Sequence, residues 1–213
     1  MSKKGVETAS PTVVLASGSS YRRELLTRLQ IPFDTLSPDV DETPMPNEQP
    51  PALAARLACA KADTAREHLA EAQPALVIGS DQVAECEGRI LGKPGTRERA
   101  FEQLQHSAGR VVTYHTAVCV LGPQAGALQQ HIDVTRVVLR PLDPREIEAY
   151  LDHEHALDCA GALKSEGLGI TLMSTFHSND PTALVGLPMI WLSTTLRSLG
   201  VAIPAATQGA QQR

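Results

Sequence analysis

No stretch of this 213-residue chain is apolar enough to cross a bilayer, since none approaches the roughly 20 apolar residues that a spanning helix needs. The polar first residues also lack the apolar core of a secretory signal peptide. There is no run of lysine or arginine, and the formal net charge is −5, which argues against non-specific binding to DNA, RNA or an anionic membrane. We therefore expect a cytoplasmic protein in which a few local cations bind any anionic ligand.

Cysteine is also scarce, and no two cysteines are spaced as in a C-x-x-C pair. The four of them are Cys59, Cys86, Cys119 and Cys159. This spacing indicates neither a zinc site nor a disulfide framework, so we expect reduced thiols. The chain also lacks internal repeats and low-complexity linkers. We expect a single domain over residues 12–203, with frayed tails at 1–11 and 204–213.

What is present is organised around residues 13–29. Residues 13–16 form an unbroken apolar run typical of a strand buried on both faces, and the leucines that follow recur at helical spacing. Between them, the turn that begins at Ser17 leads into a helix whose free N–H groups, with Arg22 and Arg23, suit a phosphate. The alternative is equally open: a serine only caps the helix, and both arginines face solvent.

A second apolar run, residues 75–78, predicts a central strand that ends abruptly at Asp81. In open α/β sheets ligands bind beyond the carboxyl ends of strands, so an acidic residue at that point is placed for chemistry. Asp81 is therefore the strongest catalytic candidate. The alternative is a turn residue that caps Gly79 and Ser80.

Two lysines are candidates for binding a phosphate. Lys93 lies between Gly92 and Pro94, which is not a Walker A loop because proline stands where Ser or Thr should bind magnesium. It can still reach a phosphate as a point charge. Lys61 interrupts the apolar stripe of a helix predicted from residue 50 to about 70. Its ammonium group either snorkels to solvent, the commoner case, or reaches a buried anion.

Acidic residues occur on two predicted loops. Asp39, Asp41 and Glu42 lie close together on a proline-punctuated loop, which either is solvated, as the residues alone favour, or faces a metal. Lys164 and Glu166 lie on a glycine-rich loop that can lie against a ligand.

The remaining segments predict further helices and one hairpin. Helices are expected over residues 96–108, from 143 and from 188, and the β-rich runs 111–121 and 128–139 should pair as an antiparallel hairpin. His153 and His155 are two residues apart and face different sides of a helix, so we expect surface histidines and not a metal site.

Six separated segments, in this order, resemble the Maf family of nucleotide pyrophosphatases, and the resemblance covers roughly residues 12–200. They are Leu15–Arg23, Asp39–Thr43, Leu57–Ala62, Val77–Gln82, Gly92–Pro94 and Val185–Pro188. The segments Ser80–Gln82 and Cys159–Gly167 resemble the YceF branch, described as hydrolysing 7-methyl-GTP. The pyrimidine (dTTP/UTP) branch would have Arg, Thr and Gln at Tyr21, Gln82 and Glu166. The YceF branch often has Trp at the Tyr21 position, so here only the aromatic character is kept.

The resemblance implies hydrolysis between the α and β phosphates of a nucleoside triphosphate, which yields a nucleoside monophosphate and pyrophosphate. It implies a divalent cation (Mg, Mn or Co) and an α/β fold related to inosine triphosphatases, with a mixed twisted sheet flanked by helices and two lobes around a central cleft. Asp81 corresponds to the family's proton acceptor, and Tyr21, Gln82 and Glu166 correspond to its specificity positions.

Charge extends this assignment to further residues. A nucleoside triphosphate carries about four negative charges, which an acidic protein must meet with cations gathered in one cleft. We expect Ser17, Arg22, Lys61 and Lys93 to bind the phosphates, and we expect Glu42 to join Asp81 as a metal ligand. Other readings stay open: another modified or non-canonical nucleotide as substrate, a nucleotide-binding regulator of cell division, and a homodimer.

Overall fold

The computed structural model describes residues 11–69, 75–123 and 127–204, and within them the chain forms one mixed seven-stranded sheet. The strand order is β2-β1-β3-β5-β6-β7, with β4 paired to β3. The strands are β1 Thr12–Ala16, β2 Asp34–Leu36, β3 Ala75–Cys86, β4 Arg89–Leu91, β5 Val111–Leu121, β6 Leu128–Leu139 and β7 Met173–His177. β1 runs parallel to β2 and β3, and the other pairs are antiparallel.

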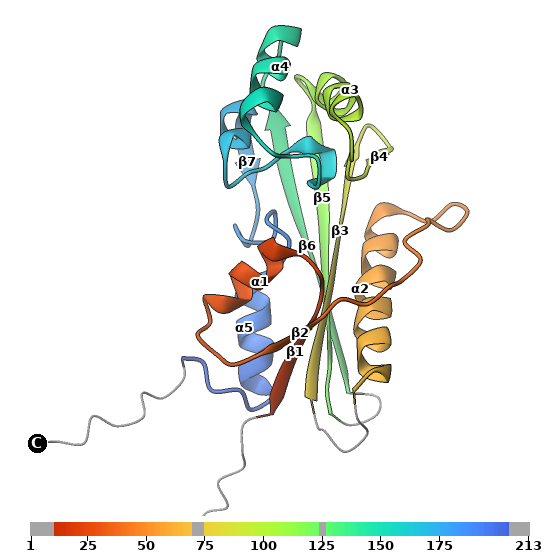
Figure 1. Cartoon of the computed structure of the whole chain (residues 1–213), viewed down its shortest axis with the longest axis vertical. Coiled ribbons are helices and arrows are strands. Elements are labelled where there is room, and N and C mark those ends of the chain that lie inside the picture. The colour runs from red at the N-terminus through yellow and green to blue at the C-terminus, as the bar shows by residue number, and fades with distance from the viewer. Residues whose placement is uncertain (1–10, 70–74, 124–126, 205–213) are drawn as a thin grey trace, which may run out of the picture.

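Helices cover both faces of this sheet (Figure 1). They are α1 Ser20–Thr27, α2 Pro50–Glu67, α3 Arg97–Ser107, α4 Pro144–His153 and α5 Met189–Ser198. α2 shares a core with β1, β3 and β5 on one face, and α1 and α5 share a second core with the same strands on the other face. α3 and α4 form a third core at the far end of β3, β5 and β6. The molecule therefore has two helical lobes, joined by the long strands.

Local sequence signals account for most of these elements. Asp143 and Glu146 form the capping box that begins α4, and Thr96 caps α3. The alternating Val, Thr and Tyr residues of the run 111–121 pair with 128–139 as the predicted hairpin. The predicted α/β class with a mixed sheet flanked by helices is confirmed. None of the described helices is both long and apolar enough to cross a membrane.

One prediction about the central strand is wrong. β3 does not end at Asp81 but continues to Cys86, and Asp81 lies in its middle, opposite Ala117 of β5. The backbone stays extended because β5 pairs with β3 from Val77 to Glu85, well beyond the point where β1 stops. The predicted tails fall almost entirely at residues 1–10 and 205–213, outside the described residues.

Candidate active site

A cavity of about 740 Å³ opens where β1 leaves β3. β1 ends at Ala16, opposite Gly79, and β4 begins to pair with β3 only at Ala84. Between these points one edge of β3 has no neighbouring strand among the described residues, and side chains from both lobes surround the gap. The nine residues to which the sequence assigns a site role all line this cavity: Ser17, Tyr21, Arg22, Glu42, Lys61, Asp81, Gln82, Lys93 and Glu166. Four other candidates do not line it: Arg23, Asp39, Asp41 and Lys164.

The turn after β1 forms one wall of the cavity. Ser19 caps α1 by accepting the Arg22 N–H at 3.4 Å, and the Ser17 hydroxyl accepts the Ser19 N–H at 3.1 Å. The Arg22 side chain turns inward: its Nε donates to Gly186 O at 2.9 Å and its Nη1 to Ser17 Oγ at 3.4 Å. Both sequence readings thus apply in part, since a serine caps the helix while Arg22 faces the cavity and Arg23 stays exposed.

Lys61 connects two carboxylates across the cavity. Its Nζ lies 2.6 Å from Asp81 Oδ1 and 2.6 Å from Glu42 Oε1. The Lys61 side chain is 11% exposed and that of Asp81 is 10% exposed. Lys61 therefore does not snorkel to solvent, because α2 presents it to the buried anion on β3. Asp81 lines the cavity, and its other oxygen, Oδ2, accepts no hydrogen bond from the described residues.

Neighbouring charges in the cavity also shift the pKa values of Glu42 and Arg22. Burial raises the pKa of Glu42, but the hydrogen bond and charge of Lys61, with the charges of Lys93 and Arg22, outweigh it, so the pKa is lowered overall. Burial lowers the pKa of the Arg22 guanidinium, against the effects of Asp81 and Glu42. The exposed side chain of Lys93 forms no ion pair within the described part of the chain, so it is free to meet a ligand anion.

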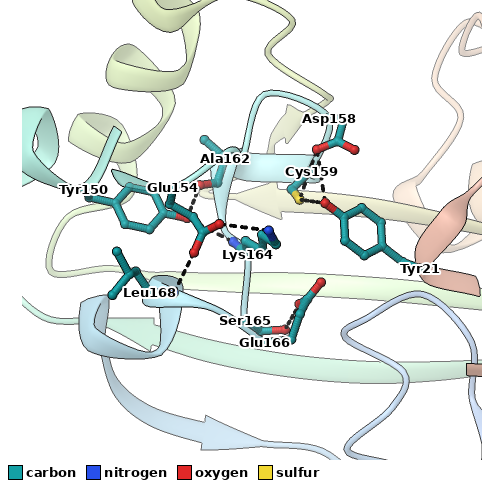
Figure 2. A network of polar contacts seen from close by, with 10 residues as sticks. All are labelled: Tyr21, Tyr150, Glu154, Asp158, Cys159, Ala162, Lys164, Ser165, Glu166 and Leu168. Carbon is teal, nitrogen blue, oxygen red and sulfur yellow. Dashed lines mark hydrogen bonds and ion pairs between the residues drawn. The ribbon is translucent and has the colours of Figure 1, made fainter. Parts of the chain in front are cut away.

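At another part of the cavity, Asp158 and Cys159 contact the hydroxyl group of the half-buried Tyr21 (Figure 2). Its hydroxyl donates to Asp158 Oδ1 at 3.4 Å, and the thiol of Cys159 approaches the same hydroxyl at 3.9 Å. Burial raises the pKa of Tyr21, and the charges of Cys159, Asp158 and Glu166 raise it further. Burial, followed by the charge of Asp158, likewise raises the pKa of the Cys159 thiol to about 12. This end of the cavity is therefore acidic, whereas Arg22, Lys61 and Lys93 make the other end cationic.

Gln82 has most of its polar capacity occupied by the protein. Its Nε2 donates to Thr116 Oγ1 at 2.9 Å and to the carbonyls of Ala183 and Leu184 at 3.1 and 3.0 Å. The network assigns the amide orientation, so its oxygen is the group left to contact a ligand.

Asp158 and Cys159 are cavity residues that the sequence analysis did not select as site residues. Cys159 begins the segment Cys159–Gly167, and Asp158 directly precedes it. The position of these two residues beside that motif was the only sequence signal that could have identified them. Only the fold brings them to Tyr21, which is more than a hundred residues away in the sequence.

The donors around Lys61 fit a divalent cation. Glu42 and Asp81 each place a carboxylate oxygen 2.6 Å from Lys61 Nζ, so the positive charge of Lys61 lies between the two carboxylates. No cluster of three or more His, Cys, Asp or Glu side chains suited to a metal occurs in the ranges that the structure describes. Two carboxylates with substrate phosphate oxygens are the usual donor set for Mg²⁺, which protein cages alone seldom hold.

Known proteins are similar to this chain in sequence and in structure. The sequence model of a family described as Maf-like protein matches residues 12–199, which include every residue that lines the cavity. A 7-methyl-GTP pyrophosphatase of Xanthomonas campestris pv. campestris (strain 8004) is 54% identical over 194 residues, 91% of this chain and 99% of that protein. A 7-methyl-GTP pyrophosphatase of Burkholderia pseudomallei (strain 1710b) is 53% identical over 190 residues, 89% of this chain and 88% of that protein. A crystal structure of a nucleoside-triphosphatase (dITP/XTP pyrophosphatase) from Mycobacterium abscessus has a TM-score of 0.42 at 13% identity, covering 89% of this chain and 98% of that one.

Proposed function

Because this chain belongs to the Maf-like protein family, we propose that it hydrolyses 7-methyl-GTP to 7-methyl-GMP and pyrophosphate. The relatives named above support this substrate by their similarity over about nine tenths of the chain. The single observation that carries the proposal is the division of charge within one cavity. A triphosphate is strongly anionic, whereas guanine methylated at N7 is cationic, so the ligand has the same two-ended character as the site.

The cationic end suits the triphosphate. Arg22, Lys61 and Lys93 supply positive charge, and Ser17 with the first N–H groups of α1 supplies neutral donors. Arg22 is held by its hydrogen bonds to Gly186 O and Ser17 Oγ before the substrate arrives, so it can stabilise negative charge as it develops with little reorganisation.

Asp81 is the proposed proton acceptor. Water attacks the α-phosphorus, its proton passes to Oδ2 of Asp81, and the bond to the bridging oxygen breaks so that pyrophosphate leaves. The ion pair between Lys61 and Oδ1 fixes the carboxylate and leaves Oδ2 without a hydrogen-bond donor among the described residues. Glu42 and Asp81 would hold a divalent cation (Mg, Mn or Co), which supplies positive charge to the phosphates and the departing pyrophosphate when it is bound.

The acidic end suits the base. The ring of Tyr21 can stack on a cationic purine, because the face of an aromatic ring is electron-rich. Glu166 can accept from N1–H and the exocyclic amino group of guanine, and the charge of Asp158 close to the Tyr21 hydroxyl adds to the attraction.

The experiment is a panel of nucleoside triphosphates, including 7-methyl-GTP, GTP, dTTP, UTP and other modified nucleotides, with pyrophosphate release measured with and without Mg²⁺, Mn²⁺ and Co²⁺. We expect the highest kcat/KM for 7-methyl-GTP, and turnover that depends on the metal. A higher kcat/KM for dTTP, UTP or another nucleotide would reject the proposed substrate while leaving the hydrolysis itself in place.

A further inference from the structure

The loop that carries Glu166 is not fixed by Glu166 itself. Its side chain is exposed and, among the described residues, hydrogen-bonds only to the Ser165 hydroxyl at 3.1 Å. Where its carboxylate lies therefore depends on the backbone of residues 162–168. If the Glu166 carboxylate distinguishes one nucleobase from another by its hydrogen bonds, the backbone of residues 162–168 must be held in place.

The end of α4 holds this backbone at three points (Figure 2). The Tyr150 hydroxyl donates to Ala162 O and accepts the Lys164 N–H, both at 3.1 Å. One turn further on, Glu154 Oε1 accepts from Lys164 Nζ at 2.9 Å, and its Oε2 accepts the Leu168 N–H at 2.8 Å. These bonds lie on both sides of Glu166 in the sequence.

Close packing shows that the loop lies directly on the Glu154 carboxylate. A Cβ added at Gly167 would overlap Glu154 Oε2 and would lie 2.9 Å from its Cδ. The N–H groups of Gly167 and Gly169 also donate to Lys164 O at 3.2 and 3.0 Å, which closes a tight turn around Glu166. Because the Glu154 side chain is only 11% exposed, few waters compete for its two bonds.

We infer that Glu154 is a positioning residue for nucleobase selection: it does not line the cavity, but it holds the loop that presents Glu166. This inference rests on the proposed function, since it deepens the account of the base end of the same site. Both carboxylate oxygens of Glu154 accept hydrogen bonds, one from Lys164 Nζ and one from the Leu168 N–H. A glutamine has only one oxygen, so its NH₂ group would face one of these two donors. The loop would then lose at least one of its attachments.

The kinetic test is a double-mutant cycle between Glu154→Gln and Glu166→Gln, read as the ratio of kcat/KM for 7-methyl-GTP to that for GTP. We expect Glu154→Gln to lower this ratio about tenfold, mainly through a higher KM for 7-methyl-GTP, with kcat changed less than about twofold. In the Glu166→Gln background, the same change should leave the ratio unaltered, because the group that it positions is already gone. Equal effects in both backgrounds would mean a general structural role and would overturn the inference.

Glu148→Gln is the matched control. Glu148 lies on α4, which ends directly before Glu154. It forms an ion pair with Arg97, but its side chain is 52% exposed and is not part of the cavity wall. We expect this variant to keep the wild-type ratio.

Hydrogen exchange tests the attachment without any turnover. The Leu168 amide should exchange about tenfold faster in Glu154→Gln than in Glu148→Gln, while amides of β5 stay equally protected in both. Unchanged exchange at Leu168 would overturn the inference whatever the kinetics show. A wild-type protein without any preference for 7-methyl-GTP would defeat the proposed function and the selective role of Glu154 with it, whereas a preference abolished by Glu166→Gln but untouched by Glu154→Gln defeats the inference alone.

Discussion

Lys61 has two carboxylate oxygens at 2.6 Å from one ammonium nitrogen, and neither carboxylate has another cation as close in the described part of the chain. This arrangement balances charge in the cavity that we propose binds a triphosphate. If a triphosphate and a metal ion bind here as proposed, the same three side chains can redistribute their contacts without leaving a charge unpaired. Asp81 lines the cavity and is the proposed proton acceptor, so its substitution is the most direct test.

Asp81→Asn should reduce the rate of pyrophosphate release at least about a hundredfold, because an amide cannot accept the proton of the attacking water. The measurement is kcat with 7-methyl-GTP, together with circular dichroism to show that the variant is folded. Near-normal turnover by a folded variant would remove Asp81 from the mechanism.

Glu166→Gln should lose the preference for 7-methyl-GTP over GTP, since the negative charge that meets a cationic base is removed while size is kept. The ratio of kcat/KM for the two nucleotides measures this, and we expect it to fall about tenfold or more. If the ratio stays as in the wild type, Glu166 is not the group that reads the base.

Cys159 should resist alkylation at neutral pH. The thiolate is the reactive form, and burial with the charge of Asp158 raises the thiol pKa to about 12. The rate of iodoacetamide labelling should therefore keep rising with pH through the range in which an ordinary cysteine, with a pKa of about 8.5, levels off. Mass spectrometry can follow both Cys159 and Cys59, whose pKa is lowered by hydrogen bonds from Cys119 and Gln130. Labelling of Cys159 that levels off near pH 9 would contradict this.

The contact between α2 and β3 places Lys61 against Asp81. Gly79 makes the close approach possible, because a Cβ there would overlap the carbonyl oxygen of Ala58 and lie 2.8 Å from the Ala62 nitrogen, both on α2. The helix backbone therefore rests on the strand at the position two residues before Asp81. Packing at Gly79 and the geometry of the site are thus coupled through one helix.

Gly79→Ala should lower the free energy of unfolding by about 1–3 kcal/mol, because α2 must move away from β3 to make room for the methyl group. It should also lower kcat, since Lys61 moves with the helix. Urea unfolding monitored by circular dichroism gives the stability change. Gly92→Ala is the control for stability, because no heavy atom lies within 4 Å of its added Cβ. Equal stability of the two variants would show that the contact does not constrain α2.

Residues of both lobes line the cavity, so we expect a bound nucleotide to touch both of them. Arg22 and Lys61 come from α1 and α2, whereas Lys93 follows β4 near the far end of the sheet. A ligand that binds only the folded molecule stabilises it by mass action.

A non-hydrolysable analogue of 7-methyl-GTP at about a hundred times its Kd should raise the free energy of unfolding by about 2.7 kcal/mol. Lys93→Met should unfold like the wild type without ligand, because Lys93 is exposed, but it should gain less at the same analogue concentration. Urea unfolding with and without the analogue measures both. An equal gain in the variant would mean that Lys93 does not contact the phosphates.

Much of this protein follows from short segments. The capping box of Asp143 and Glu146, the hairpin of residues 111–139 and the strand-to-helix turn at Ser17 depend on neighbours within a few residues, so their patterns predict them. The resemblance of six separated segments to the Maf family is confirmed by the match over residues 12–199 and by the 54% identical relative. The roles of the individual site residues stay predictions that the experiments above address.

Packing between distant segments settles the rest. Asp81 lies inside a strand and not at its end because β5, thirty residues later, continues to pair with it. Whether Lys61 snorkels or pairs depends on how closely α2 lies on β3, and the attachment of the Glu166 loop to Glu154 depends on where α4 ends. The local sequence determines which conformation each segment prefers. Contacts between side chains of distant segments depend instead on how the helices pack on the sheet, and only the tertiary structure shows this.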